Sequence, residues 1–253
     1  MFKLKTKAEI EILRRGGREL SRILNELTMA VAPGVTTLEL DALAREKIAA
    51  IDAKPSFLNY RPVGARRPFP AALCVSVNEE VVHGIPSDRA LVSGDIVTLD
   101  LGLEFEGMYT DMALTVPVGE VSTEARRLIT VTAEALMRGV AAARPGGRLG
   151  DLGAAIEAYV LAQGFDLVRD FGGHGVGFRV HEEPEVPNYG TKGKGEKLVS
   201  GLVIAIEPMV VVGEATVSTM PDGYTVKTRD GSLAAHFEQT VAITERGVEV
   251  LTP

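Results

Sequence analysis

The chain has 253 residues, a formal net charge of −7 and one cysteine, Cys74. The acidic balance argues against recognition of nucleic acid or anionic lipid through a basic surface, and one cysteine cannot form an intrachain disulfide. Residues 1–10 lack an apolar signal core, and no run reaches the roughly 18 apolar residues of a membrane span, so we expect a cytoplasmic protein that does not enter a membrane.

The first part of the chain predicts two helices followed by strands. Residues 8–32 carry apolar side chains at helical spacing, and Pro33-Gly34 ends that helix. Thr36 or Thr37 offers an N-cap for a second helix, which runs through Leu38, Leu40, Leu43 and Ile48. Strands are predicted at residues 74–77, 95–103 and 108–116.

The same order returns in the second part. Helices are predicted at residues 124–143 and 149–163, separated by Pro145-Gly146, and strands at residues 202–212, 225–228 and 237–244. Residues 61–70 and 190–197 are predicted to be exposed loops. The order predicts an α+β fold, a single domain over residues 1–253 built from two pseudo-symmetric halves, approximately 1–120 and 121–253, with a pocket at their seam.

The clearest internal repeat ends on an acid in each copy. Residues 91–100, LVSGDIVTLD, align without a gap on residues 198–207, LVSGLVIAIE. An acid that closes an apolar strand is expensive to bury unless positive charge meets it. The duplicated placement of Asp100 and Glu207 therefore predicts one site built by both halves.

Two further acids repeat in the same way. Asp111 follows Asp100, and Glu238 follows Glu207 in the corresponding place. If the residues between Asp100 and Asp111 turn a hairpin, opposed side chains there lie about 5 Å apart. Carboxylates that close repel each other unless one is protonated or a cation lies between them.

An imidazole joins these acids from a glycine-rich segment. His174 lies in FGGHGVG, residues 171–177, which has no counterpart in the first half and lacks the glycine spacing of a nucleotide loop. Four carboxylates and one imidazole suit two divalent ions about 3.5–4 Å apart, with Mn, Fe, Co and Zn all compatible.

The remaining histidines and the cysteine have more ordinary explanations. Val82-His83 and Val180-His181 repeat, each followed by proline three residues after the histidine. His236 gains nothing from the repeat, and we expect it to be structural. Cys74 would need a histidine in reach to act as a nucleophile, so we expect it in a pocket wall.

Five segments together resemble a known family. They are residues 74–86 (CVSVNEEVVHGIP), 172–177 (GGHGVG), 181–184 (HEEP), 206–209 (IEPM) and the segment around Glu238. Over essentially its whole length the chain resembles the type I methionine aminopeptidases of metallopeptidase family M24. The resemblance implies the pseudo-two-fold "pita-bread" fold, with a duplicated helix pair and antiparallel strands.

The resemblance also implies residue roles and a reaction. The reaction is hydrolytic removal of the N-terminal methionine from nascent polypeptides, with a small second residue preferred. Glu207 takes a proton from the attacking water, His181 donates to the developing oxyanion, and His83 contacts the scissile nitrogen. The implied ligands of two divalent metal ions are Asp100, Asp111, His174, Glu207 and Glu238, of which Asp111 and Glu238 bridge both ions.

The implied methionine pocket departs from the family pattern at two positions. Val180 stands where the best-known members carry an aromatic residue, and Tyr224 stands where some carry tryptophan. A missing ring in such a pocket shifts discrimination by about 1–3 kcal/mol. Besides His83 and His181, the implied substrate-binding residues are Phe57, Tyr60, Phe69, Cys74, Val180 and Tyr224.

Related proteins and a different class remain as alternatives. Prolidases and proline-specific aminopeptidases usually carry an extra N-terminal domain, type II enzymes carry a long helical insertion, and creatinase-like relatives lack metal. A binding protein on the same scaffold predicts broken ligands, and none is broken. We expect a monomer that acts on N-terminal methionine peptides; the sequence leaves ribosome association and the identity of the metals open.

Overall fold

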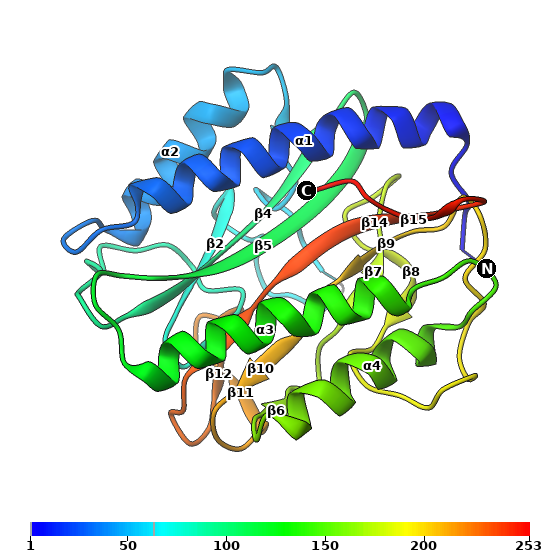
Figure 1. Ribbon diagram of the computed structural model, residues 1–253. Coiled ribbons are helices and arrows are strands. Elements are labelled where there is room, and N and C mark those ends of the chain that lie inside the picture. The colour runs from blue at the N-terminus through cyan, green and yellow to red at the C-terminus, as the bar shows by residue number, and fades with distance from the viewer. Residues whose placement is uncertain (1, 63) are drawn as a thin grey trace.

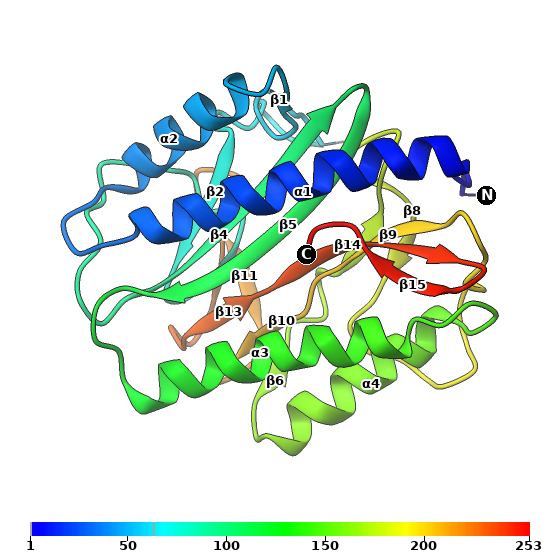
Figure 2. The same cartoon turned by 45° about the horizontal axis from the view of Figure 1, so that its top comes forward.

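The structure is a computed structural model that describes residues 2–62 and 64–253. Helices α1 (Lys7–Ala30) and α3 (Thr123–Ala142) cross one face of a large antiparallel sheet, with α2 (Thr37–Ala49) beside α1 and α4 (Leu149–Ala162) beside α3 (Figure 1, Figure 2). Each predicted helix is therefore present. Among these described residues, no helix is long and apolar enough to cross a membrane.

The large sheet has the order β1-β4-β5-β14-β9-β7-β8, with β2 beside β4 and β15 beside β14. Its strands are β1 (Lys54–Pro55), β2 (Leu73–Val77), β4 (Ile96–Phe105), β5 (Met108–Pro117), β7 (Gly173–Gly175), β8 (Glu182–Val186), β9 (Val203–Ile206), β14 (Glu238–Thr244) and β15 (Gly247–Val250). Strand β5 of the first half pairs with β14 of the second, so the seam between the halves runs through the middle of this sheet.

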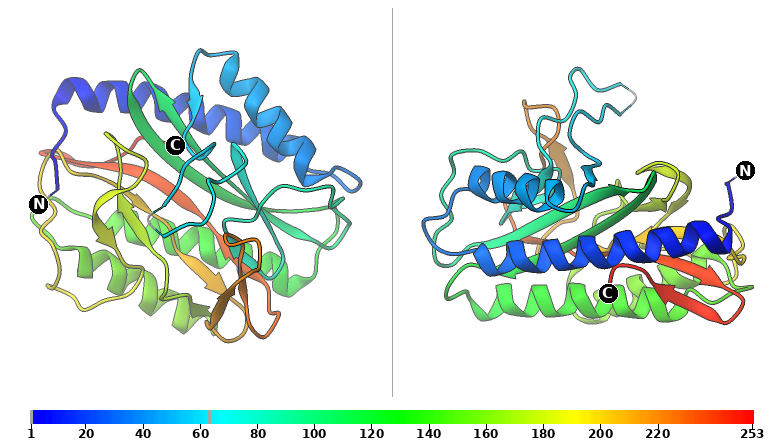
Figure 3. Two further views of the ribbon diagram at one scale, coloured as in Figure 1. Left: turned by 180° about the vertical axis from the view of Figure 1, so that it is seen from behind. Right: turned by 90° about the horizontal axis from the view of Figure 1, so that it is seen from above.

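Two smaller sheets complete the fold. One has the order β13-β10-β6 and the other β11-β12-β3. Their strands are β3 (Glu80–Val82), β6 (Asp166–Leu167), β10 (Met209–Val211), β11 (Val217–Thr219), β12 (Val226–Thr228) and β13 (Ala234–His236). Seen from above, β11, β12 and the loop after β1 lie on the side of the large sheet opposite α1 and α3 (Figure 3).

Hydrogen bonds at equivalent positions confirm the duplicated helix-pair and strand pattern. In the first half, the backbone N–H of Gly34, between α1 and α2, donates to the carbonyl of Leu91 at 2.8 Å. In the second, the N–H of Gly146, between α3 and α4, donates to the carbonyl of Leu198, also at 2.8 Å. The repeated segment thus ties each helix-helix turn to the strand that follows it.

The glycine that ends the repeated LVSG has the same conformation in both copies. Gly94 has φ 105° and Gly201 has φ 92°, a region that residues with a side chain rarely adopt. Its N–H donates to Val118 in the first half and to Ile243 in the second. The identical residues preserve the turn that leads into each strand ending on an acid.

The β4–β5 hairpin has a register that differs from the expectation of directly opposed acids. Asp100 faces Ala113, and Asp111 faces Gly102. The two turn residues between the strands have φ of 49° and 79°, which suits a tight two-residue hairpin and fixes this register. The acids are therefore diagonal neighbours on one face, a wider separation than the direct pair.

The strand predicted over residues 202–212 is wrong as one continuous element. It breaks at Glu207-Pro208 into β9, in the large sheet, and β10, in a small sheet, because proline has no N–H for the strand ladder. Residues 190–197 form the predicted exposed loop. Residues 61–70 do so as well, except that Phe69 is buried, Ala65 is half-buried and residue 63 lies outside the described residues.

Candidate metal centre

The five predicted ligands converge because they lie on adjacent strands. Along the sheet order β4-β5-β14-β9-β7, each strand contributes one ligand at the same level. Glu207 is the residue that directly follows β9, and the others lie within their strands. In that order the ligands are Asp100, Asp111, Glu238, Glu207 and His174.

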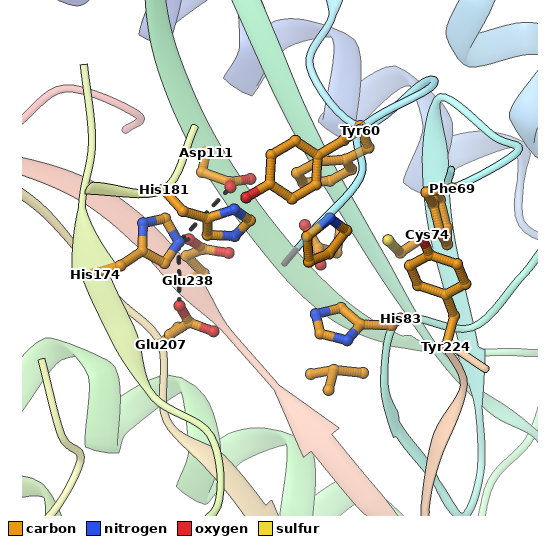
Figure 4. A pocket seen from close by; sticks show the side chains of 14 residues that line it. Tyr60, Phe69, Cys74, His83, Asp111, His174, His181, Glu207, Tyr224 and Glu238 are labelled. Atoms are coloured by element: carbon orange, nitrogen blue, oxygen red, sulfur yellow. Dashed lines mark ion pairs between the residues drawn. The ribbon is translucent and has the colours of Figure 1, made fainter. Parts of the chain in front are cut away.

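The distances between their side chains suit two adjacent cation sites. His174 Nε2 lies 3.5 Å from Glu207 Oε1 and 4.0 Å from both Asp111 Oδ2 and Glu238 Oε1 (Figure 4). Ligand bonds of about 2.0–2.2 Å place the atoms around one ion about 3–4 Å apart. Within 4.8 Å of one another lie the ligand atoms of Asp100, Asp111 and Glu238, and likewise those of His174, Glu207 and Glu238.

A third combination of donors brings in another histidine. The ligand atoms of Asp111, His174 and His181 also lie within 4.8 Å of one another. The rings of His174 and His181 meet edge to face, with centroids 4.4 Å apart. His181 is solvent-exposed, so it lies at the open side of the centre.

His174 is held with its Nε2 directed at the carboxylates. Its Nδ1 lies 2.9 Å from the carbonyl of Gly175, which fixes the tautomer with Nδ1–H donating and Nε2 unprotonated. Burial, and the neighbouring His181, lower the pKa of His174 to about 3, so the ring is neutral. A side chain at Gly173 would collide with the carbonyl of Ala205, so glycine permits the close approach of β7 to β9.

The pKa values of the four acids are raised, as expected for buried carboxylates that no positive charge neutralises. Burial, opposed in part by His236 and reinforced by the charge of Glu207, raises the pKa of Asp100 to about 7. Burial also raises the pKa of Asp111, Glu207 and Glu238 well above the ordinary carboxyl value. Divalent cations would replace the protons that these raised pKa values hold on the acids.

Unpartnered buried oxygens support the same conclusion. Asp100 Oδ1 and Glu238 Oε1 are buried and have no hydrogen-bond partner within residues 2–62 and 64–253. Buried carboxylate oxygens normally have partners, and metal ions satisfy them as well as hydrogen bonds do. A donor set of carboxylates and one imidazole fits Mn, Fe, Co or Zn.

The backbone around the acids is fixed by neighbouring polar groups. Thr240 Oγ1 accepts from the N–H of Asp111 at 2.9 Å and donates to its carbonyl at 2.8 Å. Asn188 Nδ2 donates to the carbonyl of Glu207 at 3.0 Å. Ala113 pairs with both Asp100 and Glu238 in neighbouring strands, and its small side chain leaves room between them. The acids are thus presented by a rigid frame.

A cavity of about 300 Å³ opens beside the acids. Aromatic side chains form its far end, where the ring centroids of Phe69 and Tyr224 lie 5.2 Å apart in an edge contact (Figure 4). The Tyr224 hydroxyl donates to the carbonyl of Arg67 at 2.5 Å, which holds the ring against the 61–70 loop. The lining residues outside the acids and histidines are Phe57, Tyr60, Pro62, Phe69, Cys74, Val82 and Tyr224.

Of two residues expected to line the pocket, Cys74 lines the cavity and Val180 does not. Cys74 lines the cavity, and burial raises the pKa of its thiol well above the ordinary value, which leaves it protonated and a poor nucleophile. Val180 is buried in the same apolar cluster but is not among the described residues that line the cavity. It packs behind the wall, where a branched aliphatic residue fills space.

His83 and His181 reach the centre from separate segments. His83 follows β3 with φ 60°, a conformation that is uncommon for a residue with a side chain and that marks functional sites more often than chance. Burial lowers the pKa of His83 to about 4, and its ring contacts Phe171 edge-on with centroids 5.8 Å apart. The His181 ring lies 5.1 Å from that of Tyr60.

The sequence reasoning missed two residues around the centre. His236, expected to be structural, is buried with its Nε2 3.5 Å from Glu207 Oε2. No sequence signal links it to the centre, because His236 ends β13 in a small sheet whereas Glu238 begins β14 in the large one. Lys5 is buried and forms a 2.7 Å ion pair with Glu182, the neighbour of His181, and nothing in the sequence pattern links these distant positions.

Comparison with known proteins agrees with this geometry. The model of metallopeptidase family M24 matches residues 11–245. Methionine aminopeptidases of Clostridium perfringens and Clostridium acetobutylicum are 48% and 49% identical to the chain, and each alignment covers 100% of it and 99% of the relative. The crystal structure of methionine aminopeptidase from Rickettsia prowazekii matches with a TM-score of 0.96 and 38% identity over 100% of both chains, which confirms the expected pita-bread fold.

Proposed function

Because this chain belongs to metallopeptidase family M24, we propose that it is a methionine aminopeptidase that works with two divalent metal ions and releases the first residue of new polypeptides. One observation carries the proposal: five ligand residues on consecutive strands adjoin a cavity closed by aromatic rings. The full-length relatives named methionine aminopeptidase support the same activity. We place the reaction in the cytoplasm, where new chains emerge.

We propose that the ligands would divide unequally between the two ions. Asp100 would hold one ion, whereas His174 and Glu207 would hold the other. Asp111 and Glu238, the pair related by the repeat, would be shared by both. When bound, such ions lower the pKa of water and polarise a carbonyl group.

The protein's own residues would then handle protons and orientation. Glu207, beside the attacking water, takes its proton, because a carboxylate at hydrogen-bond distance can act as general base. His181, at the open side, donates to the carbonyl oxygen of the first peptide bond as negative charge develops there. His83, which directly follows β3, contacts the scissile nitrogen and helps to protonate the leaving amine.

The cavity supports selection of methionine at the first position. Its volume of about 300 Å³ and its lining by Phe57, Phe69, Cys74 and Tyr224 suit an unbranched, apolar side chain. Methionine's flexible thioether also makes favourable contacts with aromatic rings. We propose that Tyr60 and the two catalytic histidines enclose the remaining side of the peptide and favour a small second residue.

We further propose that residues 1–253 act as a single catalytic domain. Neither half holds a complete ligand set, since Asp100 and Asp111 come from the first and His174, Glu207 and Glu238 from the second. The β5–β14 pairing joins these sets across the seam. Separate halves would therefore bind metal poorly.

Reconstitution of the metal-free protein tests the proposed function. The purified chain is incubated with Co²⁺, Mn²⁺, Fe²⁺ or Zn²⁺ and assayed on Met-Ala-Ser, Leu-Ala-Ser and Met-Pro peptides. We expect cleavage of Met-Ala-Ser with at least one ion and little cleavage of Leu-Ala-Ser. Efficient cleavage of Met-Pro with none of Met-Ala-Ser would instead indicate a proline-specific enzyme, and no cleavage by any ion would refute peptidase activity.

A further inference from the structure

His236 is a buried imidazole that the proposed reaction leaves without a role. The residue is 1% exposed, and both ring nitrogens lack a hydrogen-bond partner among the residues that the structure describes. Leaving a buried polar atom unpaired is unfavourable, so such a group in a native fold calls for an explanation. A simple structural histidine would have at least one ring nitrogen satisfied.

The backbone of His236 is held firmly enough to aim its ring. The residue ends β13 and pairs with Met209 of β10. Its N–H donates to Thr115 Oγ1 at 2.9 Å, and the same hydroxyl donates to the His236 carbonyl at 2.8 Å. Thr115 Oγ1 lies 2.8 Å from Thr98 Oγ1, so the β4–β5 hairpin sets the position of this histidine.

Glu207 lies between two imidazoles, one facing each of its oxygens. His174 Nε2 is 3.5 Å from Oε1, and His236 Nε2 is 3.5 Å from Oε2. Glu238 Oε2 lies slightly farther from His236, at 3.9 Å. The two histidines differ in one decisive respect: His174 uses Nδ1–H on the Gly175 carbonyl, which frees Nε2 as a metal ligand, whereas neither nitrogen of His236 is committed.

We propose that His236 is a positioning residue whose Nε2–H donates to Glu207 Oε2 and leaves Oε1 for the metal and the attacking water. This inference rests on the proposed function. A shift of a few tenths of an ångström brings the present separation into the range of about 2.7–3.2 Å that N–H···O bonds have. Outer partners of this kind fix the orientation of a ligand, and their loss lowers metal affinity or activity by about 10–100-fold.

Two substitutions separate hydrogen bonding from packing. His236→Leu keeps similar bulk without a donor, whereas His236→Gln keeps an N–H donor at a similar reach. We expect His236→Leu to weaken Mn²⁺ binding, measured by calorimetry on the metal-free protein, and to lower kcat, each by about 10–100-fold. Glutamine should recover most of both. The neighbouring Phe237→Leu, whose half-buried side chain packs against the hydrophobic core, is the matched control and should change neither.

A spectroscopic readout completes the test without any peptide substrate. In the Zn²⁺-loaded wild-type protein, ¹⁵N nuclear magnetic resonance should show His236 as the Nε2–H tautomer. An Nδ1–H tautomer with metal-shifted Nε2, or equal metal affinity and kcat for His236→Leu and wild type, would overturn the proposal. So would equal damage by Gln and Leu. If the wild type fails to cleave methionine peptides, the proposed function fails, yet the binding and tautomer results still decide the role of His236.

Discussion

The two halves place acids at equivalent points of the sheet, yet they do so with different side chains on different frames. The first half presents aspartates on β4 and β5, which have 10 residues each and pair along their whole length. The second presents glutamates at the end of β9, which has 4 residues, and at the start of β14, which has 7. Glutamate has one more rotatable bond, so the second half holds its acids less rigidly.

The two halves also differ in the number of histidines that they contribute. Three of the four histidines of the chain, at positions 174, 181 and 236, belong to the second half, and His83 alone belongs to the first. The duplication therefore fixes where the proposed ligands lie, whereas the second half alone supplies three imidazoles and the acid that we propose accepts the proton. The first half holds its two aspartates on long paired strands, and the second half contributes most of the residues with proposed roles in the reaction.

The strongest test of this comparison replaces, in separate variants, the acid of each half that we propose to bridge the two ions. We expect Asp111→Asn to reduce kcat by on the order of 10⁴-fold or more, the scale seen when groups that act as one unit lose a member. Glu238→Gln, its repeat-related partner, should have an effect of similar size. Both proteins should remain folded, because a neutral amide fits where a buried acid is already hard to ionise. Steady-state kinetics and circular dichroism measure the two outcomes.

The exposed Asp88→Asn serves as the control for the loss of one carboxylate. Normal turnover by Asp111→Asn would refute the assignment of two bridged metals. A large loss in one bridging variant and a small loss in the other would show that the two halves do not share the ions equally.

A second comparison uses the histidines that the repeat relates. His181→Ala should lower kcat by about 10²–10³-fold with little change in KM, because a donor to a developing oxyanion acts mainly in the transition state. His83→Ala should change KM as well, because its contact with the scissile nitrogen exists in the bound substrate. Exposed Arg179→Ala, two residues from His181, is the matched control. An effect of His181→Ala confined to KM would exclude the oxyanion role.

The sequence could predict which five residues lie together as proposed ligands, but not every neighbour of those residues. Asp100 and Glu207 are visible because two copies of one segment carry them, and the helix pairs are visible because their apolar spacing repeats. His236 has no copy, and its approach to Glu207 depends on a strand break at Pro208 that redirects β10 and β13 into a separate sheet. The hairpin register also needed the turn conformation, which composition does not specify.

Metal affinity should depend on pH through ionisation of the acids and not through the imidazole of His174. Burial raises the pKa of Asp100 to about 7, whereas burial lowers the pKa of His174 to about 3. The raised pKa favours the metal-free fold at low pH, and this contribution is lost as pH rises through about 7. Because ions bind ionised carboxylates, Mn²⁺ affinity should rise from pH 6 to 8 by about tenfold per pH unit for each proton displaced. His174, already neutral, adds nothing.

Calorimetry in two buffers of different ionisation enthalpy counts the protons released on binding. Asp100→Asn should release fewer protons at pH 7 than the wild type and show a shallower increase in affinity with pH. An affinity that stays flat between pH 6 and 8 would mean that the acids are already ionised without metal, and the electrostatic account of the centre would be wrong.

The smallest expected effect concerns the cavity that we propose holds methionine, whose walls come from both halves. Phe69, from the first, and Tyr224, from the second, meet edge to face, whereas Val180 packs behind the wall. Phe69→Leu should reduce the preference for Met-Ala-Ser over Leu-Ala-Ser, expressed as the ratio of kcat/KM values, by about 1 kcal/mol or tenfold. Val180→Ala should leave that ratio nearly unchanged, because it alters no lining surface. If Val180→Ala shifts the ratio more than Phe69→Leu does, selection depends on the packing behind the wall rather than on the rings that line it.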